Sequence, residues 1–184
     1  MEAKLLKNGQ ARLTLSFSEL AFANWAIWTT MGALDQDERR WREPAGVTYL
    51  QAQALTDEIT AVLRFIEGRP RTVDPQTGEV WPPSEPTRTA TAWDDLPRVE
   101  IARVVDPLED TKLPNRCVDL ILAREKVGAL AGAFEVSLAR VAPNRSGAEE
   151  EGFRIRFASS TKEAEAFRDE LRELEREIRI KDSS

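Results

Sequence analysis

Apolar residues recur with helical spacing in four stretches of the chain. The first stretch follows Ser16-Phe17-Ser18-Glu19, a Ser-x-x-Glu capping box in which each side chain satisfies a free backbone N–H at a helix start. Steps of three and four residues then place one set of side chains on a single helical face: Leu20, Ala23, Ile27, Met31 and Leu34. The pattern predicts a helix that begins directly after the box.

A second capping box, Thr48-Tyr49-Leu50-Gln51, opens another stretch of the same kind. Gly68 and Pro70 follow this stretch as helix stop signals. The apolar stripe between the box and the stop consists of Ala52, Leu55, Ile59, Val62 and Ile66. A second helix is therefore predicted to end before Gly68.

Both patterns recur in the second half of the chain. Adding 107 to each position of the first stripe gives Val127, Leu130, Phe134, Leu138 and Val141, which are all apolar. Adding 112 to the second pattern gives the box Ser160-Thr161-Lys162-Glu163 and the stripe Ala164, Phe167, Leu171, Leu174 and Ile178. We interpret the recurrence as a degenerate internal duplication; the alternative is that two common amphipathic patterns match by chance.

The difference between the two offsets predicts five extra residues between the helices of the second half. There, Gly152-Phe153-Arg154-Ile155-Arg156-Phe157 alternates between apolar and polar residues, as a strand does. The corresponding part of the first half, Trp41-Arg42-Glu43-Pro44-Ala45-Gly46, is predicted to be a loop.

A β-hairpin is predicted before the first helix of each half. Residues Ala3 to Lys7 and Ala11 to Leu15 flank Asn8-Gly9, the pair favoured in a tight type I′ turn. In the second half, Val99 to Val105 and Cys117 to Ala123 flank a longer connection. Each half is therefore predicted to run hairpin, helix, optional strand, helix.

These elements predict an α+β fold made of two degenerate ββα(β)α repeats. The predicted boundaries are a first repeat at 1–68, a proline-rich linker and hairpin at 69–96, and a second repeat at 97–184. Each repeat alone would bury little apolar surface, so we expect one compact body with antiparallel strands and helices packed about a pseudo-twofold axis.

The first helix carries a second apolar face that the second half lacks. Phe22, Trp25 and Trp28 occupy this face, and the equivalent positions are Ala129, Gly132 and Glu135. One interpretation is that the aromatic ridge packs into a groove formed by Gly128 and Gly132. The other interpretation is that the aromatic side chains are exposed as a binding hot spot. Asn24 lies beside this face and needs a hydrogen-bond partner if it is buried.

The segment from Arg69 to Pro97 contains six of the ten prolines. Thr72 to Trp81 is typical of a short hairpin around Pro75 and Gly78, and an extended tether is predicted after it. Trp81 and Trp93 bracket that tether and are expected to pin it to the body of the protein. The competing hypothesis is that the segment forms a lid over a site.

The overall charge limits the choice of partners. The chain has 32 acidic and 26 basic residues, a net charge of −6, which disfavours nucleic acid and anionic lipid and favours a basic partner. The local exception is Arg39, Arg40, Trp41 and Arg42, which could bind phosphate or a base. Nearby acidic residues are expected to neutralise most of this positive charge.

The sequence shows little sign of catalytic chemistry. It contains no histidine and only one cysteine, Cys117, which excludes histidine-based nucleophile pairs and thiolate metal cages. Acidic clusters at Asp35, Asp37 and Glu38 and at Glu149 to Glu151 could hold Mg²⁺, but their spacing matches no known motif and no metal or cofactor is expected. Whether the chain is an enzyme stays open, with the balance against it.

These observations predict a non-catalytic, acidic protein-binding module of the inhibitor, immunity or escort type. No apolar run is long enough to span a membrane and no signal peptide is apparent, so a cytoplasmic protein is expected. The alternative is binding or turnover of a nucleotide or metabolite in a cleft between the repeats. A homodimer is a third option. The candidate binding residues are Phe22, Trp25, Trp28, Arg39, Arg40, Trp41, Arg42, Trp81 and Trp93.

Overall fold

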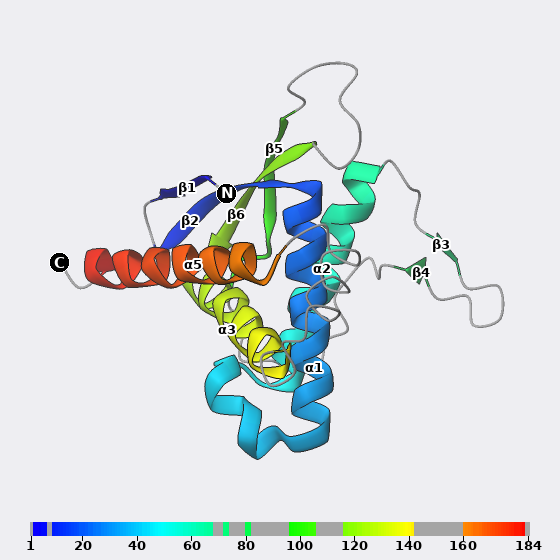
Figure 1. Cartoon of the computed structure of the whole chain (residues 1–184). Coiled ribbons are helices and arrows are strands. Elements are labelled where there is room, and N and C mark those ends of the chain that lie inside the picture. Colours follow the sequence, from blue (N-terminus) through cyan, green and yellow to red (C-terminus); the bar gives the residue numbers. More distant parts are fainter. Residues whose placement is uncertain are drawn as a thin grey trace.

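The protein has an α+β fold in which helices pack on a four-stranded antiparallel sheet (Figure 1). The computed structural model describes residues 2–6, 9–67, 72–73, 80–81, 96–105, 116–141 and 160–182. The strand order is β1-β2-β6-β5. This confirms the predicted α+β class and the antiparallel pairing of the strands.

Both predicted hairpins are present. Strand β1 (Glu2–Leu5) pairs with β2 (Gln10–Ser16), and β5 (Glu100–Val105) pairs with β6 (Cys117–Ala123). Gly9 in the first turn has a φ of 68°, a conformation that glycine adopts without strain. Strands β2 and β6 pair with each other, so one sheet contains strands from both halves of the chain.

The side chains of the two central strands alternate between a buried and a more polar face. Leu13 lies opposite Leu120, and both are fully buried. On the other face, Thr14 lies opposite Asp119 and donates a 2.8 Å hydrogen bond to its carboxylate. Arg103 on β5 also contacts Asp119, at 3.4 Å. The polar residues of this face therefore bond to one another, whereas the helices pack on the apolar face.

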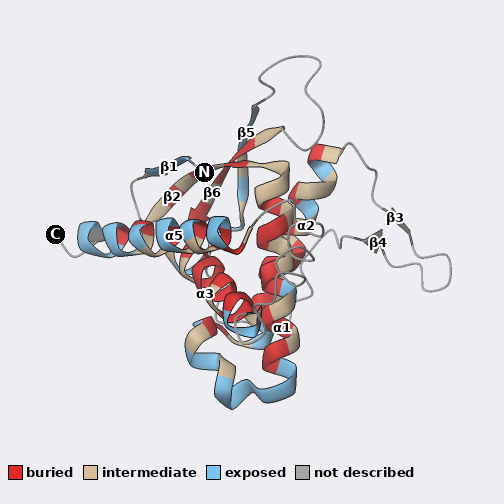
Figure 2. Ribbon diagram, in the orientation of Figure 1, coloured by how far each residue is buried: buried red, intermediate tan, exposed pale blue. Residues whose placement is uncertain are grey.

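Four helices are described: α1 (Phe17–Ala45), α2 (Tyr49–Glu67), α3 (Arg124–Val141) and α5 (Thr161–Asp182). Helix α2 packs against α1, α3 packs against both α1 and α5, and α1, α3 and α5 contact the sheet. In Figure 2 the buried residues follow the inner sides of these helices and the central strands. The apolar stripes predicted from the sequence are buried, except that the side chain of Val141 lies outside the described residues.

The three predicted capping boxes are formed. The N–H of Glu19 donates to the Ser16 hydroxyl, and the Glu19 carboxylate accepts the N–H of Ser16 at 2.8 Å. Equivalent reciprocal bonds join Thr48 with Gln51, and Ser160 with Glu163. Because each cap satisfies free N–H groups, the starts of α1, α2 and α5 follow directly from local sequence.

The loop predicted at Trp41 to Gly46 is wrong, because α1 continues to Ala45. Asp37 interrupts the helix with φ −157° and ψ 78°, and its carboxylate accepts the N–H of Arg40 at 3.2 Å. This bond caps a new helical segment. Gly46, with φ 66°, ends the segment in the left-handed conformation.

The predicted contact between the aromatic ridge and the two glycines is also wrong. A Cβ on Gly132 would lie 2.1 Å from the Ala45 carbonyl oxygen, and a Cβ on Gly128 would lie 3.0 Å from the Glu175 carboxylate. Because Gly132 has no side chain, the end of α1 can approach α3 closely there, and the Glu175 side chain of α5 can do so at Gly128. The ring of Phe22 packs on Phe134 instead, with centroids 4.9 Å apart.

Hydrogen bonds join the two halves at both ends of the β2–β6 pair and between α1 and α3. Phe17 N–H donates to the Arg116 carbonyl at 2.7 Å, and Arg124 N–H donates to the Gly9 carbonyl at 2.9 Å. Between the helices, the Thr30 hydroxyl lies 3.4 Å from the Ala133 carbonyl, and the Ser137 hydroxyl donates to the Ala26 carbonyl at 3.1 Å. Both hydroxyl-bearing residues are buried.

The short hairpin predicted in the linker has its counterpart in a second, two-stranded sheet of β3 (Thr72–Val73) and β4 (Val80–Trp81). The strand predicted at 152–157 and the tether predicted at 82–92 lie outside the described residues. Among the described helices, none combines the length and apolar character needed to cross a membrane.

Candidate functional site

The aromatic residues of α1 differ in exposure along the helix. Phe22 is buried, and its ring stacks on Trp25 with centroids 5.8 Å apart and planes 9° apart. Trp25 is partly buried, and Trp28 is 52% exposed. Phe22 therefore belongs to the core, whereas the two tryptophans reach the surface.

We define the tryptophan face as Ala21, Trp25, Trp28 and Gly32. Steps of four, three and four residues place these four positions on one side of α1, and all of them retain some exposure. Asn24 lies beside this face, where its side-chain oxygen accepts the Thr60 hydroxyl of α2 at 3.4 Å. The face therefore lies on a helix that is held by a neighbour, and it can bury an apolar surface of a partner.

The arginine cluster predicted as a second site lies beyond the break in α1. Arg39, Arg40 and Arg42 are exposed, and Trp41 is partly buried. The Arg40 guanidinium lies 4.8 Å from the centre of the Trp41 ring, and Arg42 lies 3.8 Å from Glu38. Figure 1 shows this part of α1 at the end of the helix farthest from the sheet. The structure does not bring the cluster and the tryptophan face together.

The remaining predicted tryptophans cannot be assigned to either surface. Trp81 belongs to β4, but its side chain lies outside the described residues, as does the whole of Trp93. Whether the segment between them is a tether or a lid stays a prediction.

A cleft of about 350 Å³ lies where the two halves meet. It is lined by the turn of the first hairpin, the start of α3 and the segment that leads to β5: Gly9, Gln10, Leu96, Pro97, Ala123, Arg124 and Glu125. Arg124 and Glu125 form a 3.2 Å ion pair at this position. None of the candidate residues that the structure describes lines the cleft, because its walls come together only when β2 pairs with β6.

A buried ion pair near the cleft was also missed by the sequence analysis. The Lys126 ammonium lies 2.7 and 2.8 Å from the two carboxylate oxygens of Glu58, and the Lys126 residue is 1% exposed. The available signal was a lysine directly before Val127 in a buried stripe. Lysine is almost never fully buried unless it is paired.

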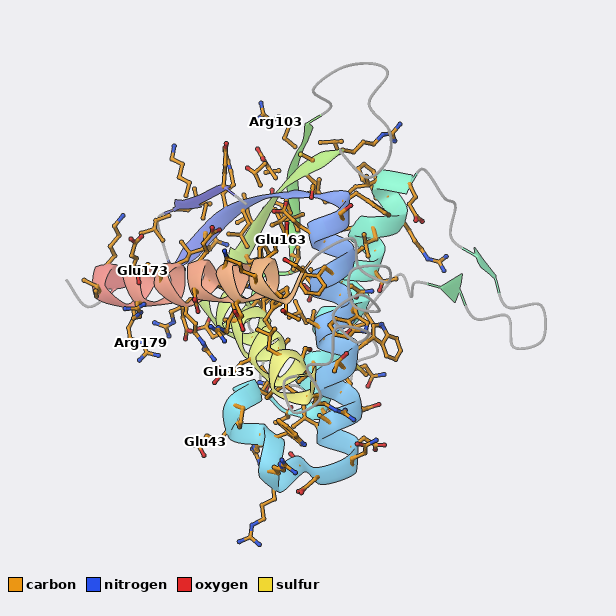
Figure 3. The ribbon with its side chains drawn as sticks, in the orientation of Figure 1. Glu43, Arg103, Glu135, Glu163, Glu173 and Arg179 are labelled. Atoms are coloured by element: carbon orange, nitrogen blue, oxygen red, sulfur yellow. The ribbon has the colours of Figure 1, made fainter. Side chains whose placement is uncertain are left out.

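A network of charges on α5 also faces α3. Arg172 donates hydrogen bonds to Glu135 of α3 at 2.8 Å and to Glu175 at 3.0 Å. Figure 3 labels Glu135, which lies below α5 in that view. Burial alone would lower the pKa of Arg172, but the hydrogen bonds that its guanidinium donates to Glu135 and Glu175 raise it. Arg172 therefore stays charged and links the two helices.

The described residues show no group of three side chains that could hold a metal ion. Asp35, Asp37 and Glu38 are exposed, and Glu149 to Glu151 lie outside the described part of the chain. Burial raises the pKa of the Cys117 thiol, with Glu19 adding to the effect, so that the neutral thiol is favoured. Cys117 therefore lacks the lowered pKa of a reactive cysteine.

Comparison of the chain with protein-family models, curated proteins and solved structures gave no match. The structure thus defines the class of protein as α+β, with helices packed on an antiparallel sheet.

Proposed function

We propose that this chain is a non-catalytic, cytoplasmic protein-binding module of the inhibitor, immunity or escort type, and that it contacts its partner through the tryptophan face. The observation that carries the proposal is the 52% exposure of Trp28 on a well-packed helix. Tryptophan is enriched at the energetic centres of protein interfaces, since its large ring buries much apolar area and loses little conformational freedom.

The rigidity of the tryptophan face supports this role. The ring of Phe22 packs on Trp25 and on Phe134 of α3. The ring of Phe134 in turn packs on Phe167 of α5, with ring centroids 4.9 Å apart. The Trp25 indole therefore belongs to a series of ring contacts contributed by three helices. A surface held in this way needs little ordering on binding, which favours affinity.

The chemistry of the expected partner follows from the face and from the overall charge. The partner would present an apolar patch to Trp25 and Trp28. The net charge of −6 favours basic residues around that patch, and Asp35 lies exposed two turns beyond Trp28. A second copy of the chain is the other occupant to consider.

We further propose that residues 1–68 and 97–184 are two copies of one unit, related by a pseudo-twofold axis and joined by 69–96 in one compact body. Three features support this. Leu13 pairs with Leu120, 107 positions later. The two hydrogen bonds at the ends of the β2–β6 pair exchange donor and acceptor when 107 is added to the positions in the first half, and so do the two hydroxyl bonds between α1 and α3. An experimental structure tests it. Gln10 to Ala33 should superpose on Cys117 to Arg140 better at an offset of 107 than at offsets one helical turn away.

The binding proposal is tested by affinity capture followed by reconstitution. The full chain, Trp28→Ala and Phe65→Ala are each used to capture proteins from cells that express the chain. Phe65 is the matched control because it is an exposed aromatic residue, at 62%, on a different helix. Partners identified in this way are purified and titrated by calorimetry.

We expect Trp28→Ala to weaken binding by at least about 2 kcal/mol, close to thirtyfold, as at an interface hot spot. Phe65→Ala should bind like the unmodified chain. The proposal is wrong if no partner binds the purified protein, or if both variants bind it with unchanged affinity.

A small-molecule site is the second candidate, because the cleft of about 350 Å³ between the halves has the size of a ligand pocket. Among the described residues, its polar side chains are Gln10, Arg124 and Glu125, and the tryptophans expected from the sequence do not line it. A thermal-shift screen of nucleotides and metabolites distinguishes the two functions. A saturable shift that Arg124→Ala abolishes would favour the small-molecule function over protein binding.

A further inference from the structure

The chain reaches β5 through the segment Leu96–Val99, which we call the strap. Leu96 and Val99 are partly buried and pack against the hydrophobic core. The strap contacts Glu58 on α2 and Lys126 on α3. It therefore bridges the second helix of the first half and the first helix of the second half.

The buried ion pair of Lys126 and Glu58 binds the strap through its backbone. An ammonium group donates up to three hydrogen bonds, and the acceptors of Lys126 include both Glu58 oxygens and the Pro97 carbonyl, the last at 3.0 Å. The Glu58 carboxylate also accepts the N–H of Val99 at 2.8 Å. The positive partner thus bonds a strap carbonyl, and the negative partner bonds a strap N–H two residues later.

The strap also forms one wall of the cleft, through Leu96 and Pro97. The opposite walls are the first hairpin turn and the start of α3, which the bond from Arg124 N–H to the Gly9 carbonyl holds together. Those walls belong to the paired sheet and the helix that follows it, whereas the strap is neither helix nor strand. A displacement of the strap would therefore widen the cleft without breaking the β2–β6 pair.

We propose that the Lys126–Glu58 pair is a latch, and that the strap opens from it as a local unit while the rest of the fold stays intact. A segment held by a few polar contacts and two apolar side chains can open at a lower free energy than global unfolding. The opening should depend specifically on these two charges, because the loss of either one leaves the other buried and unpaired. This inference does not depend on the proposed binding partner.

The first test is hydrogen exchange of the complete, unmodified chain at several urea concentrations below unfolding. Global opening exposes a large surface, so its free energy falls steeply with urea, whereas local opening depends on urea only weakly. We expect the Val99 amide to exchange with a much smaller urea dependence than the Leu120 amide in the central strand. Equal slopes for the two amides would overturn the proposal, and this outcome needs no variant.

The second test compares Glu58→Gln and Lys126→Met with Arg172→Met, which breaks the ion pair between α3 and α5. The two latch variants should accelerate exchange at Val99 by more than about tenfold relative to Leu120, since breaking a buried pair is costly. Arg172→Met should not. If either latch variant fails to fold, the double variant Glu58→Leu/Lys126→Met is used, because it replaces the ion pair with two uncharged side chains. Fast exchange at Val99 in that folded double variant supports the latch, and protection equal to that of the unmodified chain overturns it.

Discussion

Replacing Gly132 with alanine should test the close approach of the end of α1 to α3. A Cβ built on Gly132 lies 2.1 Å from the Ala45 carbonyl oxygen, 2.7 Å from its carbon and 3.0 Å from the Pro44 carbonyl oxygen. These are backbone atoms, so no side-chain rotation can relieve the overlap. The restarted end of α1 would have to move away from α3 by about 1 Å or more to restore ordinary contact distances of about 3.5 Å.

Two opposing effects set the change in the free energy of unfolding that Gly132→Ala should cause. Alanine stabilises a helix by about 1 kcal/mol relative to glycine. Overpacking of a close contact costs about 1 to 3 kcal/mol, and here rigid backbone on both sides places the cost at the upper end or above. We therefore expect Gly132→Ala to lower the free energy of unfolding by about 1 to 2 kcal/mol, or about 2 to 8 °C in Tm for a chain of this size.

Gly128→Ala is the matched control. Its Cβ would meet only the end of the Glu175 side chain, at 3.0 Å, and that side chain can rotate away. The helix propensity should then dominate, giving a variant as stable as the unmodified chain or up to about 1 kcal/mol more stable. Urea unfolding followed by circular dichroism measures both variants. Equal stability of the two alanine variants would refute the inferred close approach of α1 and α3.

Three further predictions concern the core, a cap and a titrating group. Phe134→Ala should lower the free energy of unfolding by about 3 to 5 kcal/mol in urea titrations, because it removes the ring shared by Phe22 and Phe167; a loss below about 1 kcal/mol would contradict the ring stack. Ser160→Ala should cost about 1 kcal/mol by removing the cap of α5, and Ser160→Thr should retain most of the stability in the same titration. Burial, reinforced by Glu58, raises the pKa of Asp57, so its charged form destabilises the fold at neutral pH. Asp57→Asn should be more stable than the unmodified chain at pH 7. This advantage should disappear as the pH falls through the raised pKa of Asp57 toward the ordinary aspartate value of 3.8, which thermal melts across that range would show.

The secondary structure was largely predictable because its signals are local. The Asn8-Gly9 turn, the three capping boxes and the helical stripes each depend on residues within one or two turns of each other. The failure at Trp41 to Gly46 also has a local cause. A loop was predicted there, but the Asp37 side chain caps a restarted helix and Gly46 ends it.

The candidate site was only partly predictable. Of the two interpretations of Phe22, Trp25 and Trp28, exposure holds for Trp28, whereas Phe22 is buried against Phe134 and not in a groove of the two glycines. Periodicity places side chains on a helical face, but it does not say which neighbouring helix covers that face. Asn24 was expected to need a partner if buried, and in the structure it accepts the Thr60 hydroxyl of α2.

By itself, the sequence determined the order and extent of most elements and the residues that form the buried stripes, since backbone propensity, capping and amphipathic spacing act over a few residues. Only the tertiary structure decided which surfaces meet: β2 on β6, Gly132 against the Ala45 carbonyl, and Lys126 on Glu58 beneath the strap. Such contacts join residues far apart in the chain, and their free energies depend on close packing and on the burial of charge. Neither quantity exists until the chain has folded.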